Sequence, residues 1–272
     1  MTLVLSGGGA KCAAHIGVAR AFAEAGLTPV RYVATSMGAV IAAALAAGVA
    51  GEALLASLAE VGRSGVVKDP WAFMTGLFAR SLLRPAPFRH ALERLVPARR
   101  FAELAVPVSV TVTDLDTGEQ LLFGAGGEDA PLLDVLCATC ALPVYYPPVS
   151  LAGRRCGDGG LRGPLPLDIA ARLAEEAVVA VDVGPGFDVT GPTHTRGVPP
   201  VVRAHDDAVG ALMAQATTAQ LALWRSDTSR PPLIYIRPRV EPAATFMVDR
   251  VQQYAEDGYV AARDALASAA RP

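Results

Sequence analysis

The first fifty residues repeat one pattern, and this pattern constrains the fold more than any other feature of the chain. An apolar segment at Thr2–Leu5 is followed by three glycines and by an amphipathic helical segment that ends near Gly26. A second apolar segment at 30–34 comes next, with a tight turn at 35–38 and an alanine-rich helical segment at 39–48. Strands that alternate with helices form parallel neighbours, because each helix crosses back over the sheet. The pattern therefore predicts an α/β fold with a mainly parallel central sheet.

The rest of the chain continues the alternation, with one interruption. Further strands are expected at 106–113, 120–123, 177–184 and 233–237, and further helices at 201–225 and 247–270. Residues 70–100 are rich in aromatic residues, proline and arginine, which we interpret as a small helical cap insertion at about 65–100. The Gly- and Pro-rich residues 184–200 are expected to form a mobile loop. Because no internal repeat or linker is present, residues 1–272 are predicted to form a single domain.

Composition excludes two broad classes of protein. Hydrophobic residues make up 52% of the chain and charged residues 18%, which excludes a disordered or fibrous protein. The formal net charge is −2, so no nucleic-acid partner is expected.

The sequence also bears on the location of the protein. The N-terminus has neither the basic region nor the long apolar region of a secretory signal. Residues 32–51 carry no charge and are long enough to span a membrane, but they contain strand-like residues, Gly38 and Gly48. A buried strand, a turn and a core helix explain this stretch better. We therefore expect a soluble, cytoplasmic protein.

Four cysteines are too few and too unevenly spaced for a disulfide framework: Cys12, Cys137, Cys140 and Cys156. The sequence Cys137-Ala-Thr-Cys140 has the spacing of a redox or zinc motif. No second pair completes a metal site, and an apolar run precedes Cys137. We interpret these cysteines as buried thiols, with redox or metal chemistry as the alternative.

A glycine-rich loop joins the first strand to the first helix. Such a loop can direct several backbone N–H groups at one point, where the helix dipole adds positive potential, so it suits a phosphate or an oxyanion. The Walker pattern is absent, and a dinucleotide fingerprint would need glycine at Cys12 and an acid at the end of the next strand. An oxyanion is therefore favoured. The residues of this loop are Gly7, Gly8, Gly9, Ala10 and Lys11.

The second strand–helix unit carries a serine at its turn. Ser36 lies in the sequence Ala34-Thr-Ser-Met-Gly38, which is similar to G-x-S-x-G with alanine in place of the first glycine. On a sharp strand-to-helix turn, a serine projects its hydroxyl outward while small neighbours let the strand and helix approach. Adjacent strands would bring this serine beside the glycine-rich loop.

A glycine-flanked aspartate is the third motif. Asp158 precedes Gly159 and Gly160. Taken alone, such an aspartate is a turn residue. Its functional alternative is a carboxylate that orients and deprotonates a serine.

Together and in this order, the three motifs resemble the patatin-like phospholipase family over most of the first 170 residues. The resemblance implies a three-layer α/β/α fold and hydrolysis of lipid acyl esters by a Ser–Asp dyad. It assigns Ser36 as the nucleophile and Asp158 as its base, with the amides around Gly8, Gly9 and Ala10 as the oxyanion hole and Lys11 at the usual basic position. Cys12 and Ala34 stand where the family usually has glycine.

The sequence thus predicts a serine hydrolase of phospholipid, lysophospholipid or acylglycerol esters that works through an acyl-enzyme without metal or cofactor. One alternative is an acyltransferase with the same dyad, and another is a non-catalytic lipid-binding protein. Cys12 could also be a reactive thiol beside Lys11 and a helix N-terminus.

Other polar residues are assigned simpler roles. His15 is interpreted as structural, and Asp114 and Asp116 as residues of a hairpin turn. His194 and His205 follow Asp158, so a Ser–Asp–His triad is formally available. It is disfavoured because Ser36 comes only in the second strand–helix unit, with no upstream sheet to hold an earlier oxyanion loop.

Residues 68–100 combine seven basic and two acidic residues with large apolar side chains. One interpretation is an ordinary cap helix with solvated arginines. The other is a lid that makes peripheral membrane contact and gates the Ser36 pocket.

Overall fold

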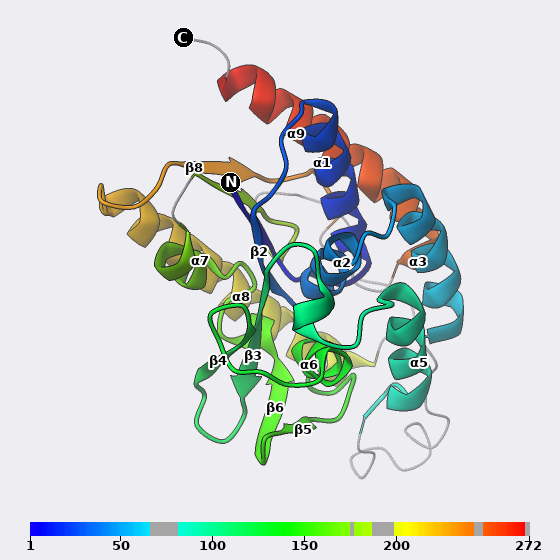
Figure 1. Ribbon diagram of the computed structural model, residues 1–272. Helices are drawn as coiled ribbons and strands as arrows, with labels where there is room; N and C mark the ends of the chain where they lie inside the picture. The colour runs from blue at the N-terminus through cyan, green and yellow to red at the C-terminus, as the bar shows by residue number, and fades with distance from the viewer. Residues whose placement is uncertain (66–80, 175–176, 187–198, 242–246, 270–272) are drawn as a thin grey trace.

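The computed structural model describes residues 1–65, 81–174, 177–186, 199–241 and 247–269, with the backbone alone at 61–65. Its centre is a sheet whose described strands follow the order β5-β6-β3-β2-β1-β7-β8, with β4 also paired to β3 (Figure 1). The strands are β1 (Thr2–Leu5), β2 (Arg31–Thr35), β3 (Val108–Asp114), β4 (Gln120–Gly124), β5 (Val149–Leu151), β6 (Arg154–Asp158), β7 (Val178–Val181) and β8 (Leu233–Ile236).

The middle of the sheet is parallel. Strand β1 pairs in parallel with β2 and β7, β2 with β3, and β7 with β8. Strands β1, β3 and β7 are buried along their whole length, as expected for a parallel sheet covered on both faces. The predicted mainly parallel sheet is confirmed. The sequence did not predict the antiparallel pair β5–β6.

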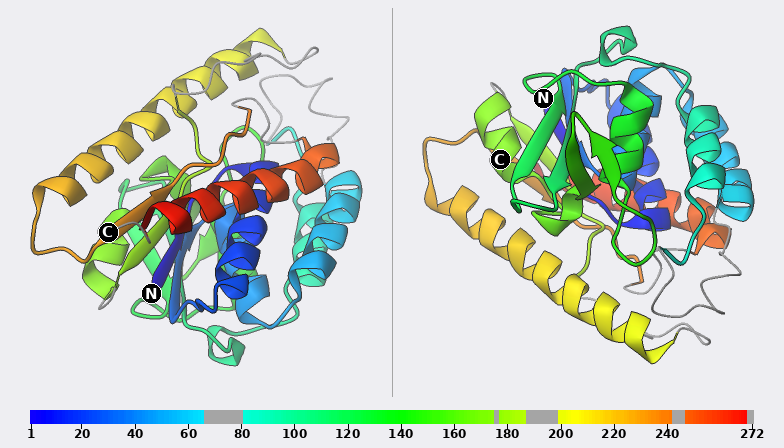
Figure 2. Two further views of the ribbon diagram at one scale, coloured as in Figure 1. Left: turned by 90° about the horizontal axis from the view of Figure 1, so that it is seen from above. Right: turned by 90° about the horizontal axis from the view of Figure 1, so that it is seen from below.

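The helices form layers on both sides of this sheet (Figure 2). One apolar core joins the sheet to α1, α2, α3, α5, α6 and α9, and a second joins its other face to α7 and α8. Neighbouring strand residues alternate between the two cores: Leu3 and Leu5 belong to the first and Val4 to the second. The three-layer α/β/α fold is therefore confirmed. The helices are α1 (Ala13–Glu24), α2 (Met37–Ala46), α3 (Gly51–Gly65), α5 (Pro85–Leu95), α6 (Leu132–Thr139), α7 (Leu167–Leu173), α8 (Pro200–Ser226) and α9 (Val251–Ala269), with 3₁₀ turns η1 (Gly9–Cys12), η3 (Phe101–Glu103), η4 (Gly159–Leu161) and η5 (Val248–Arg250).

Strand β3 brings two distant segments together. Its residues 109–113 pair with β4 along one edge, which leaves the other edge for β2 and β6. On that edge β2 ends opposite Thr111, and β6 arrives from the opposite direction with Asp158 opposite Val112. The carboxyl ends of β2 and β6 therefore meet end to end beside β3. The next residue after β2 is Ser36.

Helix α9 packs closely against α1, the helix that follows the glycine-rich loop. A Cβ atom on Gly17 would lie 1.7 Å from the carbonyl oxygen of Ala255, and one on Gly258 would lie 2.0 Å from that of Ala14. Only glycines allow the two backbones to come this close.

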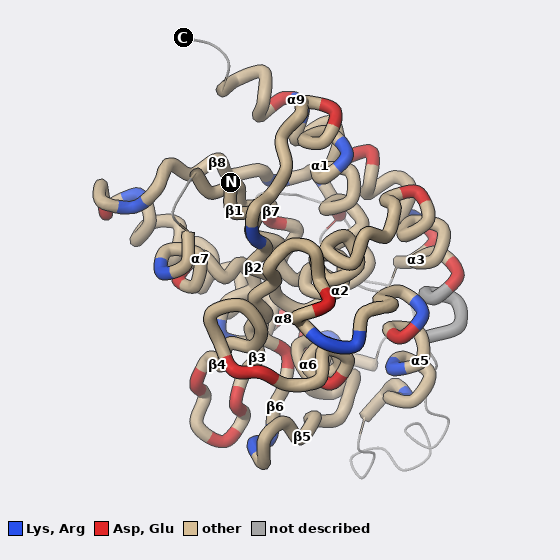
Figure 3. The backbone as a smooth tube through the Cα atoms, in the orientation of Figure 1, with Lys and Arg blue, Asp and Glu red and all other residues tan. Residues whose placement is uncertain are grey.

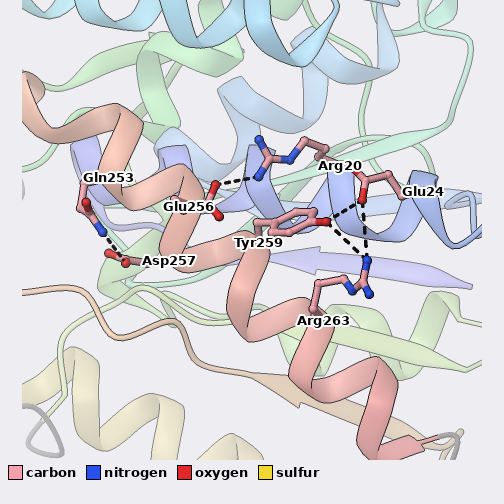
Figure 4. A network of polar contacts seen from close by, with 7 residues as sticks. All are labelled: Arg20, Glu24, Gln253, Glu256, Asp257, Tyr259 and Arg263. Atoms are coloured by element: carbon pink, nitrogen blue, oxygen red, sulfur yellow. Dashed lines mark hydrogen bonds and ion pairs between the residues drawn. The ribbon is translucent and has the colours of Figure 1, made fainter.

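Polar contacts flank the crossing of α1 and α9 (Figure 4). Arg20 pairs with Glu256 at 2.8 Å, and its guanidinium group lies over the ring of Tyr259. The Tyr259 hydroxyl donates to Glu24 at 2.7 Å. These contacts fix the C-terminal helix in register on α1.

Part of the expected cap insertion is described. Helix α5 packs into the core through Ala91, Leu92 and Leu95. Figure 3 shows acidic residues on the described part of α3, and both basic and acidic residues on α5. Arg89 pairs with Asp134 at 2.7 Å and Arg94 with Glu60 at 2.6 Å. Residues 66–80 lie outside the described residues, so the lid stays a prediction.

Two further expectations concern the loop at 184–200 and a possible membrane-spanning helix. Of the predicted loop at 184–200, residues 187–198 lie outside the described residues. Among the helices that are described, none combines the length and the apolar character needed to cross a membrane.

Candidate active site

Ser36 and Asp158 meet where β2 and β6 end. The Ser36 hydroxyl donates to Oδ2 of Asp158 at 2.8 Å, although 122 positions separate the two residues. Both side chains are buried, with exposed fractions of 9% and 5%. The structure therefore brings together the predicted nucleophile and the predicted base in direct contact.

The backbone at Ser36 adopts the strained geometry of a nucleophile turn. Its φ of 53° lies in the left-handed region, which residues other than glycine rarely adopt. Gly38 allows the turn, since a Cβ there would lie 2.4 Å from the carbonyl oxygen of Ser6. Ala34 lies earlier, inside β2, where its side chain is fully buried in the core. The alanine thus occupies a position where a methyl group fits.

Burial moves the pKa of Asp158 towards neutral pH. Oδ1 accepts the N–H of Gly160 at 2.8 Å, and Oδ2 accepts the Ser36 hydroxyl. Burial raises the pKa of Asp158 to about 6, and these two hydrogen bonds only partly oppose the rise. A carboxylate with this pKa can both take and return a proton near neutral pH.

The two residues after Asp158 are glycines because neighbouring atoms lie too close for a side chain. A Cβ on Gly159 would lie 2.2 Å from the carbonyl oxygen of Thr111, and one on Gly160 would lie 3.0 Å from Oδ1 of Asp158. Both glycines keep the strand end tight against β3 and leave the carboxylate room.

The glycine-rich loop runs beside Ser36. A Cβ on Gly7 would lie 3.0 Å from that of Ser36, and the N–H of Gly7 donates to the carbonyl oxygen of Pro164. Within the described residues, the N–H groups of Gly8, Gly9 and Ala10 donate to no protein acceptor. They are the first donors of the η1–α1 helical run, where free N–H groups attract negative charge. The loop that contacts Ser36 through Gly7 therefore carries N–H groups of the kind that an oxyanion site requires.

Lys11 follows these three residues in the loop. Its buried side chain lines a cavity of about 10 Å³ with Asp182 and Arg237, which follow β7 and β8. Burial lowers the pKa of Lys11 to about 8. The structure thus groups Lys11 with Asp182 and Arg237.

The side chains of Cys12 and His15 both contact the carbonyl oxygen of Ser6, just before the glycine-rich loop. The Cys12 thiol lies 3.5 Å from the carbonyl oxygen of Ser6, and burial raises the pKa of that thiol. This burial argues against a reactive Cys12, because a buried neutral thiol is a poor nucleophile. Nε2 of His15 lies 2.9 Å from the same Ser6 oxygen, and burial lowers the pKa of His15 to about 4. His15 is a neutral structural residue, as predicted.

The other polar candidates lie elsewhere. His205 on α8 pairs with Asp206 at 3.1 Å, and His194 lies outside the described residues. Asp114 accepts the N–H groups of Asp116 and Thr117 in the turn between β3 and β4, which confirms the hairpin turn.

The pair Cys137 and Cys140 is not bonded. Cys140 is buried beside the Ser36 hydroxyl, and its burial raises the pKa of the thiol well above the usual value. Cys137 is half-buried near Arg89. Within the described ranges, no three His, Cys, Asp or Glu side chains come close enough together to hold a metal ion.

Thr139, which the sequence did not indicate, contacts the predicted nucleophile directly. Its Oγ1 accepts the N–H of Ser36 at 2.8 Å and donates to the carbonyl oxygen of Thr111 at 2.7 Å. The only signal was a polar residue near the end of an apolar segment, where a buried hydroxyl needs a partner.

Comparisons with known proteins found similar sequences. A family model described as patatin-like phospholipase matches residues 3–171. An uncharacterized NTE family protein of Mycobacterium tuberculosis is 30% identical over 194 residues, which cover 69% of this chain and 51% of the relative. A patatin-like phospholipase domain-containing protein of Caenorhabditis elegans is 28% identical over 283 residues, covering 97% and 20%. The chain thus spans about half the length of the mycobacterial relative.

A search of solved structures found VipD from Legionella pneumophila. The TM-score is 0.48 at 17% sequence identity, and the match covers 98% of this chain and 66% of that one.

Proposed function

Because the chain belongs to the patatin-like phospholipase family, we propose that it hydrolyses acyl esters of lipids with Ser36 as nucleophile and Asp158 as base. The observation that carries the proposal is the 2.8 Å hydrogen bond from the Ser36 hydroxyl to the Asp158 carboxylate. Family membership supports a hydrolase of lipid esters, and this contact supports the particular residues.

In the proposed first step, Asp158 takes the proton of Ser36 as Oγ attacks the ester carbonyl carbon. The carbonyl oxygen becomes an oxyanion, which the N–H groups of Gly8, Gly9 and Ala10 stabilise. The tetrahedral intermediate collapses to an acyl-serine, and Asp158 returns the proton to the departing alcohol.

In the second step, water replaces the alcohol. Asp158 accepts a proton from this water, which attacks the acyl-serine carbonyl and passes through a second oxyanion at the same donors. Collapse releases a fatty acid, and the proton returns to Oγ of Ser36. The N–H of Gly160 holds the carboxylate in one orientation throughout.

The direct Ser–Asp contact favours a dyad over a triad. A histidine between the two residues would separate the serine hydroxyl from the carboxylate by the width of an imidazole ring. With a pKa near 6, Asp158 is mostly ionised at neutral pH and can act without an intermediary.

A fluorophosphonate probe tests the proposal, because it reacts covalently with activated serines. We expect mass spectrometry to find the adduct on Ser36 in the wild type and in Ser150→Ala, a control at an exposed serine. Ser36→Ala should show no adduct. An unlabelled wild-type protein would instead support a non-catalytic lipid-binding protein.

Product analysis then identifies the reaction. Incubation with phospholipid, lysophospholipid and acylglycerol should release free fatty acid. If adding an alcohol or amine diverts the acyl group to that acceptor at the expense of fatty acid, the acyltransferase alternative is correct.

A further inference from the structure

The end of helix α6 and the residues that follow it contact both Ser36 and Asp158. Oγ1 of Thr139, the last residue of α6, accepts the N–H of Ser36 at 2.8 Å. Two residues later, the carbonyl oxygen of Ala141 accepts the N–H of Asp158 at 3.0 Å. One short segment therefore fixes the backbone of the nucleophile and the backbone of the base relative to each other.

The N–H of Ser36 cannot be satisfied by the sheet. Strand β2 pairs with β3 up to the level of Thr111, and the next position on β3, Val112, is already opposite Asp158. A buried N–H without a partner is costly, so the turn needs an acceptor from outside the sheet. The hydroxyl of Thr139 is that acceptor.

The hydroxyl of Thr139 is itself held in one orientation. It donates to the carbonyl oxygen of Thr111 at 2.7 Å, so its lone pairs face the N–H of Ser36. The hydroxyl groups of Thr111 and Thr35 lie 2.5 Å apart. Thr139, Thr111 and Thr35 are all completely buried. The Thr139 hydroxyl thus connects the backbone of β3 to the backbone of the turn, and the hydroxyl pair of Thr111 and Thr35 joins β3 to the end of β2 beside it.

We propose that Thr139 is a positioning residue for Ser36, an inference that rests on the proposed function. Its hydroxyl holds the strained backbone at Ser36 so that the side-chain oxygen stays within hydrogen-bond distance of Asp158. In the motif Cys137-Ala-Thr-Cys140, the residue that serves the reaction is then the threonine between the cysteines.

The test compares Thr139→Val with Thr139→Ser. Valine has the shape of threonine but neither donates nor accepts, whereas serine keeps the hydroxyl. For Thr139→Val we expect kcat to fall by roughly 10- to 100-fold with little change in KM, since small misplacements of a reacting group have effects of this size. Fluorophosphonate labelling of Ser36 should slow by a similar factor. Thr139→Ser should retain most of the wild-type rate.

Thr217→Val is the matched control. Thr217 is a buried threonine on α8 whose hydroxyl has no hydrogen-bond partner among the described residues, so valine should leave both rates unchanged. Thermal unfolding of each variant separates a loss of positioning from a loss of folded protein. Should Thr139→Val not fold, Thr139→Ala removes the same hydroxyl with less side chain to accommodate, and it carries the same expectation.

The outcomes separate this inference from the proposed function. If the wild type labels and folded Thr139→Val labels equally fast, the inference is wrong and the proposed function stands. A loss in Thr139→Ser as large as that in Thr139→Val would also overturn it, because the hydroxyl would then be irrelevant. If the wild type itself does not label, the proposed function fails, and the inference fails with it.

Discussion

At the scale of single residues, burial sets the protonation of the groups around Ser36. It raises the pKa of Asp158 to about 6 and lowers that of His15 to about 4. It also keeps the thiols of Cys12 and Cys140 neutral. The carboxylate in contact with the nucleophile therefore changes charge just below neutral pH, while its neighbours stay uncharged.

The first prediction concerns the pH dependence of activity. In the proposed mechanism Asp158 acts as a base only when it is ionised, so kcat/KM should be constant above about pH 7 and fall about tenfold per unit below pH 6. The measurement is hydrolysis of a soluble short-chain ester between pH 4.5 and 9, with unfolding followed at each pH. Full activity at pH 4.5 would show that another group is the base.

The second prediction concerns stability. The pKa of Asp158 is about 6 in the folded protein against 3.8 for the ordinary side chain, so its ionisation disfavours the folded state. The stability present below about pH 4 is lost as the pH rises through 6. Asp158→Asn should therefore be more stable than wild type at pH 8, by up to about 3 kcal/mol, with a smaller difference at pH 4.5. Chemical denaturation at both pH values measures it, and a less stable variant at pH 8 would contradict the prediction.

At the scale of elements, β3 determines which segments meet. The sequence predicted β1, β2, β3 and β7, because buried parallel strands are short apolar runs between turn residues. It did not predict β6, since Arg154–Asp158 has two arginines and a glycine and lacks apolar alternation. This segment is a strand because it pairs with the free edge of β3.

The candidate site likewise has residues that the sequence indicated and one that it did not. The loop at Gly8 and the turn at Ser36 have local patterns, so the sequence alone indicated them. Asp158 was recognised by its two following glycines. Thr139 could not be predicted, because its role depends on a contact between residues 103 positions apart.

The third prediction concerns the crossing of α1 and α9. Gly258→Ala should destabilise the protein by more than about 2 kcal/mol, because the new methyl group would overlap the backbone at Ala14. Gly210→Ala on α8 is the matched control: its methyl group would meet one atom at 3.9 Å, and alanine favours a helix by up to about 1 kcal/mol. Denaturant unfolding measures both. Equal stability of the two variants would mean that the helices can move apart without loss.

At the scale of the whole molecule, the C-terminal third adds strands and a helix that pack against the region covered by the family match. Residues 3–171 contain Ser36 and Asp158, while β7, β8 and α9 follow the match. Strand β7 pairs with β1 in the middle of the sheet, and α9 covers α1. Both elements that flank the glycine-rich loop therefore depend on chain beyond the match.

The fourth prediction concerns peripheral membrane contact, which we propose for residues 68–100. The segment carries net positive charge, so binding should be stronger to vesicles with anionic lipid than to neutral ones and should weaken with salt. Arg80→Glu with Arg84→Glu should reduce sedimentation with anionic vesicles and leave short soluble esters cleaved at the normal rate. Arg225→Glu with Arg239→Glu changes the charge equally at exposed positions outside the segment and serves as the control. Equal binding to both kinds of vesicle, unaffected by salt, would leave only an ordinary cap helix.

The most direct test of the dyad is a double-mutant comparison of Ser36→Ala and Asp158→Asn in hydrolysis of a lipid ester. Since the two residues act as a unit, each single variant should lose at least about 1,000-fold in kcat, and the double variant should lose no more than the worse single one. Circular dichroism and thermal unfolding confirm that each variant is folded. Turnover of folded Asp158→Asn near the wild-type rate would contradict the assignment of Asp158 as the base.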